Sequence, residues 1–599
     1  MVKQEVASGG GLVARQLAAE GVSRVFGIID GTYYGLYRSL PEHGIELVSP
    51  RHETTAAHMA GAYARLTGQL GVCIASNGPG VANVLPGVAV EQAEGNRVLL
   101  VTSSRRTGIA YPDRGGTYQC FDQVGATAAM AKWSVHVPDR ARLLELLRRA
   151  LRCVHTGRPG VVHLDVPEDI LNGDGPIDPR EHWAPERSRR RAPLAPDPGE
   201  VDAAAAMLCA ARRPLIHAGS GVVHALAYDE LARVARLAMA PVTTSWGARG
   251  ALAEPSAHAI PMIHTELVDD VRNDADVVLT VGSRLGETDW WGKPPNWAPA
   301  SEQRMIQVDV DPERLGANKP VDLALVGDAR RFLAALGDAL EERAGSVDLD
   351  GRRARLAAYV EERRRDRAKL DRRLRKAGAP VHPARVPVAC QQTFPRDTVW
   401  VFDGGNTAVW ANFFHQVRVP GALLGTFKFG MLGAGVGQAL GAQVACPGRR
   451  VVCITGDGAL GMHPQEVETA VRHGLPIVYV VLCDGQWGMV KMSQQIATAP
   501  LRTVARKVVA NRPLPADELV YADFAETRFD RLAQALGAHG ERVGHSDELR
   551  PALARARDAG APAIVHVDVD PNEHMWAPRL QVFKKLHEEP SGEPRGRQR

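Results

Sequence analysis

The segment Val451–Met489 constrains the fold of this chain more than any other segment. It contains an apolar run, a Gly-Asp-Gly turn around Asp457, a helical pattern, a Gly-Leu-Pro break and a second apolar run that ends before Asp484. This order predicts a strand, a crossover helix and a second strand parallel to the first. Because the carboxyl ends of parallel strands meet at one edge of a sheet, Asp457 and Asp484 are expected side by side, where open α/β sheets bind ligands.

Oxygen ligands beside a glycine turn predict a particular kind of site at that edge. The carboxylates of Asp457 and Asp484 suit Mg²⁺, which often binds proteins together with phosphate oxygens. Gly456 and Gly458 leave room for main-chain N–H groups to approach a phosphate. We therefore expect a Mg²⁺–diphosphate site here. The alternative is two surface aspartates in an ordinary strand–helix–strand unit.

The length of 599 residues predicts several domains rather than one core. Strand-like and helical patterns alternate along three blocks of the chain, and such alternation predicts parallel sheets with helices on both faces. The expected fold class is therefore α/β, with three doubly wound parallel-sheet domains. Their expected bounds are residues 1–175, 199–340 and 379–572, followed by a C-terminal tail over 573–599.

Composition argues against several classes of protein. The chain is 45% hydrophobic and 23% charged with a net charge of +4, a balance that does not suggest binding to nucleic acid. Its eight cysteines are scattered without a C-x-x-C pair, so neither a disulfide framework nor a zinc site is expected. No apolar run has the length of a membrane span and no signal-peptide pattern opens the sequence, so we expect a cytoplasmic protein with no membrane partner.

The order of these features resembles the acetolactate synthase-like branch of the thiamine diphosphate (ThDP) enzymes over nearly the whole chain. That family has a pyrimidine-binding domain, a central domain and a diphosphate-binding domain whose Gly-Asp-Gly motif leads to an Asn-Asn pair. Here Cys483-Asp484 stands in place of that pair. The resemblance implies that Asp457, Asp484 and the main-chain carbonyl of Gln486 hold Mg²⁺, with one more negative charge than in the family motif.

A motif in the first block also carries the resemblance. The segment Arg51–Ala62, RHETTAAHMAGA, is similar to the family motif that supplies the catalytic glutamate, with Ala62 in place of a glycine. The resemblance implies that Glu53 hydrogen-bonds the pyrimidine ring of ThDP and so activates the cofactor. Taken alone, Glu53 is also a glutamate at a helix N-terminus, where the helix dipole favours a negative charge.

The third block contains the other residues that the resemblance assigns to the cofactor. Leu432 stands where the family has the apolar residue that bends ThDP, although core packing is its plainer interpretation, and the carbonyl of Gly430 would accept a bond from the cofactor's amino group. Gly405, Asn406 and Thr407 follow a strand and would contact the diphosphate, with helix capping by Asn406 as the alternative. The remaining expected contacts are Gly456, Gly458 and Ala459 in the turn and Gln486, Trp487, Gly488 and Met489 in the later loop.

Three further side chains are candidates for the reacting centre. Tyr118-Gln119 stands where acetolactate synthases and 2-hydroxyacyl-CoA lyases have Phe-Gln, so Gln119 either points at the substrate or makes a structural hydrogen bond. Asp30 precedes Glu53 as an aspartate does in pyruvate decarboxylase-like enzymes, and it is either a proton relay or a turn aspartate. His463 either lines the pocket or caps the helix that follows.

The resemblance implies a ThDP- and Mg²⁺-dependent lyase or carboligase that decarboxylates a 2-oxo acid and transfers the acyl unit to an acceptor. Met492-Ser493 replaces a Gln-Trp pair of acetolactate synthases, so a 2-hydroxyacyl-CoA lyase with an acyl-CoA substrate is an alternative. A flavin-containing oxidoreductase of the pyruvate oxidase type and a non-catalytic ThDP-binding homologue are two more.

The resemblance also bears on partners. In the family the cofactor lies between the first domain of one subunit and the third domain of another, so we expect a homodimer or homotetramer with active sites at the subunit interface. The turn His217–Gly221 follows a strand of the central block, where relatives bind FAD, ADP or nothing. FAD or ADP in this domain is an alternative that we do not favour.

Overall fold

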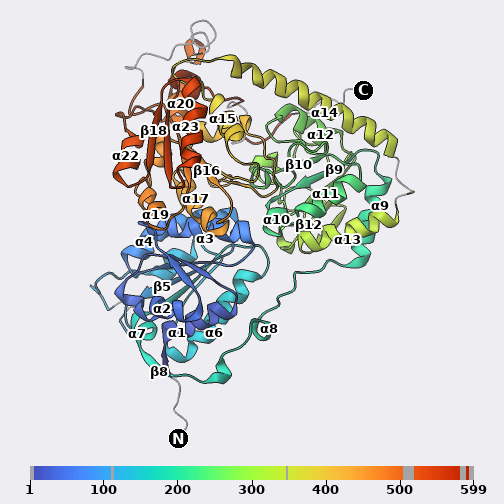
Figure 1. Cartoon of the computed structure of the whole chain (residues 1–599). Helices are drawn as coiled ribbons and strands as arrows, with labels where there is room; N and C mark the ends of the chain where they lie inside the picture. The colour runs from blue at the N-terminus through green and yellow to red at the C-terminus, as the bar shows by residue number, and fades with distance from the viewer. Residues whose placement is uncertain are drawn as a thin grey trace.

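The computed structural model describes residues 6–592 apart from 110–113, 344, 346–348, 499, 504–518 and 580–587. Figure 1 shows three α/β bodies, with the first (blue) below the third (orange and red) and the second (green) beside them. Each body contains one parallel sheet, so the predicted fold class of three doubly wound parallel-sheet domains is confirmed. Among the described helices, none is both long enough and apolar enough to cross a membrane.

The first sheet has the strand order β3-β2-β4-β5-β7-β6. The chain runs outward from β2 to β3 and then returns to β4, so the direction of winding reverses between β2 and β4. Open sheets of this kind bind ligands at such a reversal. The strands are β2 (Arg24–Gly27), β3 (Glu46–Val48), β4 (Gly71–Ala75), β5 (Val98–Ser104), β6 (Trp133–His136) and β7 (Val161–Pro167), and the main helices are α1 (Gly9–Ala19), α3 (Glu53–Thr67), α4 (Pro79–Glu94) and α6 (Arg140–His155).

The second sheet has the order β10-β9-β11-β12-β13, with its reversal between β9 and β11. A long helix, α14 (Leu349–Asp371), then crosses the top of the molecule to the third body (Figure 1). The strands are β9 (Pro214–Ala218), β10 (Val242–Thr244), β11 (Val277–Val281), β12 (Arg304–Asp309) and β13 (Leu323–Val326), and the helices include α9 (Pro198–Ala210), α10 (Ser220–His224), α11 (Tyr228–Leu237), α12 (Thr265–Asp274) and α13 (Ala329–Glu342).

The third sheet has the order β15-β14-β16-β17-β19-β18, with its reversal between β14 and β16. The predicted strand–helix–strand unit is present, because β16 pairs in parallel with β17. The strands are β14 (Val399–Phe402), β15 (Leu423–Leu424), β16 (Val451–Gly456), β17 (Val478–Cys483), β18 (His539–Val543) and β19 (Ala563–Asp568), and the helices include α16 (Asn406–Phe414), α17 (Ala434–Ala445), α19 (Glu466–Arg472), α20 (Gly488–Thr498), α22 (Phe529–Ala535), α23 (Ser546–Asp558) and α24 (Pro571–Met575).

The connection from the first body to the second begins as a strand. The first described residues form β1 (Val6–Ser8), which pairs in antiparallel fashion with β8 (Asp174–Pro176) at the expected end of the first domain. Main-chain hydrogen bonds of an antiparallel pair hold both ends of the first body together.

Helices α3 and α17 join the first and third bodies (Figure 1). Buried side chains of both helices, including Met59, Ala60 and Leu440, belong to one hydrophobic cluster. A Cβ atom at Gly441 would lie 2.7 Å from the Cα atom of Met59, so this close approach requires glycine. Because α3 begins at Glu53, the contact also fixes where that carboxylate lies relative to the third sheet.

Candidate functional site

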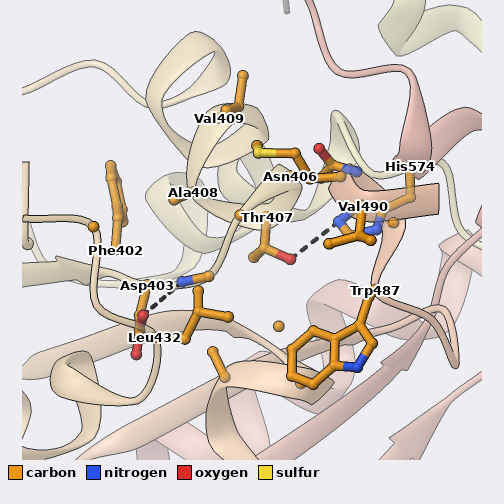
Figure 2. Close-up of a pocket in the computed structure, with 18 of the residues that line it drawn as sticks. Phe402, Asp403, Asn406, Thr407, Ala408, Val409, Leu432, Trp487, Val490 and His574 are labelled. Carbon is orange, nitrogen blue, oxygen red and sulfur yellow. Dashed lines mark hydrogen bonds between the residues drawn. The ribbon is translucent and has the colours of Figure 1, made fainter. Parts of the chain in front are cut away.

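A cavity of about 500 Å³ opens at the carboxyl edge of the third sheet, at the reversal between β14 and β16. Figure 2 shows Leu432 and Trp487 pointing into the space below Thr407, with His574 on the opposite side. We call its wall the third-sheet edge, which comprises residues 403–407, 430–432, 456–459, 484 and 486–489 together with His574. All the cofactor and metal residues expected from the sequence of the third domain are therefore gathered around one space.

The two predicted carboxylates are adjacent and are held by main-chain N–H groups. Asp457 accepts from Gly458 N at 2.7 Å through Oδ1, and from Gly485 N at 2.8 Å and Asp484 N at 3.1 Å through Oδ2. Burial raises the pKa of Asp457 to about 6, and the nearby negative charge of Asp484 acts in the same direction. A bound cation would offset both effects, since it favours the charged form of a carboxylate.

The donor set fits Mg²⁺ bound together with a phosphate ligand. Among the described residues there is no group of three or more His, Cys, Asp or Glu side chains that could hold a metal ion unaided. Mg²⁺ is usually bound by one or two carboxylates and completes its shell with waters and phosphate oxygens. Asp457 and Asp484 meet that requirement, and the main-chain carbonyl of Gln486 is the further protein ligand to be tested.

The turn after β14 has the geometry of a phosphate cradle. Gly404 has a left-handed φ of 95°, and a Cβ atom there would lie 3.2 Å from Gly456 N, so the two glycine turns approach closely. Helix α16 begins at Asn406 without a side-chain cap, which leaves its first N–H groups facing the edge. Asn406 is therefore not the helix cap that the sequence offered as an alternative. Its Oδ1 atom is buried without a hydrogen-bond partner, and its amide donates to Met575 O at 3.4 Å.

Asp403 positions the segment that contains Gly430 and Leu432, and sequence reasoning missed it. Its carboxylate accepts from Gly404 N at 2.6 Å and from Gly433 N and Gly435 N at 3.0 Å each. These bonds satisfy the first N–H groups of α17. Because the carboxylate is buried, its pKa is raised to about 6. Its only local signal was an aspartate directly after an apolar strand.

Glu53, Asp30 and Gln119 lie at the carboxyl edge of the first sheet, which we call the first-sheet edge. Glu53 is the first residue of α3, and its Oε2 accepts from Asn83 Nδ2 at 3.1 Å. Asp30 accepts from Thr32 N at 2.9 Å and from the Thr32 hydroxyl at 2.6 Å, as expected of a turn aspartate.

Gln119 is connected to Asp30 by a chain of hydrogen bonds. The Thr32 hydroxyl is 2.6 Å from that of Ser103, which accepts from Asn77 N at 2.9 Å. The amide of Asn77 donates to Gln119 O at 3.1 Å. Gln119 itself has a left-handed φ of 54°, a conformation that costs about 1–3 kcal/mol for a residue with a side chain and often marks functional sites.

The residues of the first-sheet edge do not line this cavity. None of Glu53, Asp30 and Gln119 is among the described residues that line the cavity. His463 also lies outside the lining, between the first and third bodies, with its ring centroid 5.4 Å from that of His52. Burial and the neighbouring His58 and His52 lower the pKa of His463 to about 4. Helix α19 has Gln465 as its N-cap residue, so His463 is not its cap.

Two of the lining residues that were not sequence-based candidates come from other parts of the chain. His574 belongs to α24, which the sequence bounds assigned to the C-terminal tail, and its Nε2 lies 3.0 Å from the Thr407 hydroxyl. Trp246 comes from the second body. The part of the expected tail that lies over 580–587 and 593–599 falls outside the described residues.

The glycine turn of the second body packs against its own sheet and against the third body. A Cβ atom at Gly221 would lie 2.6 Å from Gly282 Cα, so the turn packs against the end of β11. The hydroxyl of Ser220 accepts from Lys428 Nζ of the third body at 2.6 Å. Both features place this turn at a joint between domains.

Comparison with known proteins gives matches over all three bodies. Family models of thiamine pyrophosphate enzymes match residues 7–126 (N-terminal TPP binding domain), 201–336 (central domain) and 403–567 (C-terminal TPP binding domain). The acetolactate synthase large subunit of Mycobacterium tuberculosis is 31% identical over 94% of this chain and 96% of its own length. Acetolactate synthase isozyme 3 large subunit of Escherichia coli is 28% identical over 96% of this chain and 97% of its own. A probable acetolactate synthase large subunit of Methanocaldococcus jannaschii is 27% identical over 94% and 92%.

Proposed function

The chain belongs to the thiamine pyrophosphate enzyme family, and on that premise we propose that it uses ThDP and Mg²⁺ to decarboxylate a 2-oxo acid and transfer the acyl unit to an acceptor. The observation that carries the proposal is the pair Asp457 and Asp484, tied together by main-chain N–H groups at the wall of a ligand-sized cavity. Acetolactate synthases are the named relatives, which supports a 2-oxo acid as the donor substrate.

The third-sheet edge would bind the diphosphate end of the cofactor. Asp457, Asp484 and the carbonyl of Gln486 would hold Mg²⁺, and the turn after β14 would contact phosphate oxygens through N–H groups and the Thr407 hydroxyl. Leu432 would support the bent cofactor, and Gly430 would accept a bond from its amino group. The other proposed contacts are Gly405, Asn406, Gly456, Gly458, Ala459, Trp487, Gly488 and Met489.

The first-sheet edge would activate the cofactor and receive the substrate. When bound, ThDP supplies a carbon nucleophile that adds to a carbonyl and accommodates the charge released by C–C cleavage. Glu53 would share a proton with the pyrimidine ring, and its bond to Asn83 keeps the carboxylate oriented in the absence of the cofactor. Gln119 and Asp30, joined through Thr32, Ser103 and Asn77, would face the substrate, with Asp30 as a proton relay. His463, whose ring lies beside that of His52, would support this edge.

A complete site would need two copies of the chain. Glu53 and the Asp457–Asp484 pair lie at separate edges of one chain, so we propose a homodimer or homotetramer in which each cofactor binds between the first domain of one subunit and the third domain of another. The proposed domains are residues 1–175, 199–340 and 379–572. The expectation of a cytoplasmic protein stays a prediction.

A substrate panel tests the proposed reaction. Purified protein with ThDP and Mg²⁺ is mixed with pyruvate, longer and aromatic 2-oxo acids, and 2-hydroxyacyl-CoA thioesters, and CO₂, aldehyde and acyloin products are measured. We expect CO₂ release from at least one 2-oxo acid, with an acyloin product when an acceptor is added. Turnover of thioesters alone would contradict the proposed substrate class, and binding of ThDP without any turnover would favour the non-catalytic alternative.

A further inference from the structure

A short helix after the last strand of the third body reaches the proposed metal site. Helix α24 (Pro571–Met575) begins after Asp570, whose carboxylate accepts from Asn572 N and Glu573 N at 2.9 Å each. An aspartate N-cap followed by proline fixes where such a helix begins. The helix carries His574 to the wall of the cavity, opposite Leu432 and Trp487 in Figure 2.

The imidazole of His574 bridges the two halves of the third-sheet edge. Its Nδ1 lies 2.7 Å from Asp484 Oδ2, and its Nε2 lies 3.0 Å from the Thr407 hydroxyl. Because a carboxylate only accepts hydrogen bonds, Nδ1 must carry the hydrogen, and in the neutral ring Nε2 then accepts from Thr407. One ring thus connects the loop after β17 with the turn after β14.

The main chain of α24 holds this ring in place. The carbonyl of His574 accepts from Trp410 Nε1 at 2.9 Å, and the carbonyl of Pro571 accepts from Gln486 Nε2 at 2.9 Å. The next side chain, Met575, is buried in a cluster with Trp410. The helix is therefore fixed from α16 on one side and from the metal loop on the other, which leaves the imidazole little freedom to turn away.

Asp484 is a carboxylate whose direction depends on these contacts. Its side chain is 2% exposed, and Oδ2 accepts from His574 Nδ1 and from Gln486 Nε2 at 3.1 Å. The other oxygen, Oδ1, takes part in neither bond. Hydrogen bonds to one oxygen of a ligating carboxylate orient the other oxygen toward the metal and restrict its rotation.

We propose that His574 is a positioning residue that orients Asp484 toward the metal and links that ligand to the diphosphate turn through Thr407. The proposal rests on the proposed function, since it assumes a divalent cation at Asp457 and Asp484. It predicts that the Nδ1–H donor matters most, because this donor is the one that contacts the metal ligand. Removing an outer partner of a metal ligand typically weakens metal binding about 10- to 100-fold.

Titration with Mn²⁺ in the presence of ThDP, followed by electron paramagnetic resonance, tests the proposal without measuring activity. We expect His574→Ala to raise the dissociation constant of Mn²⁺ about 10- to 100-fold. In His574→Asn the amide N–H can occupy the position of Nδ1–H, so the affinity should stay within about threefold of the wild type. In His574→Gln the amide reaches instead toward Thr407, so this variant should resemble His574→Ala.

A second histidine–aspartate pair in the same body supplies the matched control. His566 Nε2 lies 3.0 Å from Asp568 Oδ1, and His566 is as buried as His574, but it does not line the cavity. His566→Asn should leave the Mn²⁺ affinity unchanged. Melting temperatures of the metal-free proteins report any general loss of stability. If His574→Ala fails to fold, the Asn and Gln variants decide the matter by their difference.

The outcomes separate this proposal from the proposed function. If the wild type fails to bind Mn²⁺ with ThDP, the proposed function is wrong. If the wild type binds and His574→Ala binds equally well, the function stands and the role of His574 is wrong. Equal losses in the Asn and Gln variants would also overturn it, because a merely structural role does not distinguish the two nitrogen positions.

Discussion

The carboxyl edges of the first and third sheets share a winding pattern, yet they are prepared in different ways. At the third-sheet edge Asp403, Asn406, Thr407 and His574 are at most 4% exposed, and N–H groups already surround the carboxylates. The first-sheet edge is open, and the Tyr118 side chain beside Gln119 is 75% exposed. The third-sheet edge is therefore preformed within one chain, whereas the first-sheet edge is exposed.

Exposed apolar side chains lie beside both edges, and they support the proposed contact with a second copy. Ile29 and Phe121 are 55% and 36% exposed next to Asp30 and Gln119. Phe429 and Val490, at the rim of the third-sheet edge, are 51% and 52% exposed. Exposed apolar groups beside polar functional residues are typical of interfaces. Both rims belong to one chain. In a dimer, the first-sheet rim of each copy can therefore cover the third-sheet rim of the other copy.

Removal of the first carboxylate should have the largest effect. In Asp457→Ala the buried N–H groups of Gly458, Asp484 and Gly485 lose their acceptor and the cation loses a ligand. We expect metal and cofactor to be lost together, with activity below detection, as measured by ThDP content after gel filtration and by turnover. Unchanged retention of ThDP would show that the third-sheet edge is not the diphosphate site.

A change at the first-sheet edge should separate binding from chemistry. In Glu53→Gln the amide can keep its contact with Asn83, but it cannot exchange a proton with the cofactor. We expect turnover to fall about 10²- to 10⁴-fold, the usual contribution of a positioned acid or base. The dissociation constant of ThDP, measured by calorimetry, should stay near the wild-type value. A large loss of ThDP affinity would mean that both edges act as binding surfaces, and the contrast between them would fail.

The preformed state of the third-sheet edge predicts a pH effect on stability. Burial raises the pKa of Asp403 to about 6 in the folded protein, above the ordinary carboxyl value near 3.9. The folded state therefore binds more protons between about pH 4 and pH 6, and stability is lost as the pH rises through this window. The loss is about 2–3 kcal/mol by pH 7.

Asp403→Asn cannot titrate and provides the comparison for that effect. The difference in free energy of unfolding between wild type and variant should change by about 2–3 kcal/mol from pH 4 to pH 7. The wild type becomes less stable relative to the variant as the pH rises. Denaturation of the cofactor-free proteins at several pH values measures it. A constant difference across this range would mean that Asp403 is charged throughout and that its three N–H donors outweigh burial.

The joint between the bodies should be sensitive to a single methyl group. In Gly441→Ala the new Cβ atom would lie 2.7 Å from Met59 Cα, which forces α17 away from α3. Overpacking of this kind costs about 1–3 kcal/mol. We expect a lower melting temperature and a smaller effect on ThDP affinity than in Asp457→Ala, since the third-sheet edge is built within its own body. Gly448→Ala, where a Cβ atom meets nothing within 4 Å, is the matched control.

Local pattern and connectivity account for the part of the site that the sequence predicted. Apolar runs around a helical segment predicted β16 and β17, and parallel pairing placed Asp457 and Asp484 together because their strands are neighbours. The N-terminal position of Glu53 on α3 followed from its motif in the same way. Such inferences need only the helical connection between two neighbouring parallel strands.

The rest of the site could not be predicted, because it depends on where segments distant in the sequence pack in the fold. His574 is 90 positions from Asp484, and it lies where the sequence bounds place the C-terminal tail, after the last predicted strand. The only local signal was Asp570-Pro571, which predicts a helix start but not where the helix packs. Trp246 reaches the cavity from another body for the same reason. The separation of Glu53 from Asp457 within one chain likewise depends on how whole domains pack.

The central claim is that each active site combines the first-sheet edge of one subunit with the third-sheet edge of another. Coexpression of Glu53→Gln and Asp457→Ala chains with different affinity tags gives a hetero-oligomer that tests it directly. Each parent alone should have at most about one-hundredth of the wild-type turnover, but the mixed dimer contains one site with both changes and one site with neither. We predict roughly half the wild-type turnover of a 2-oxo acid, as expected for one intact site in two. A purified hetero-oligomer as inactive as its parents would contradict the claim, because it would place both edges of each site in one chain.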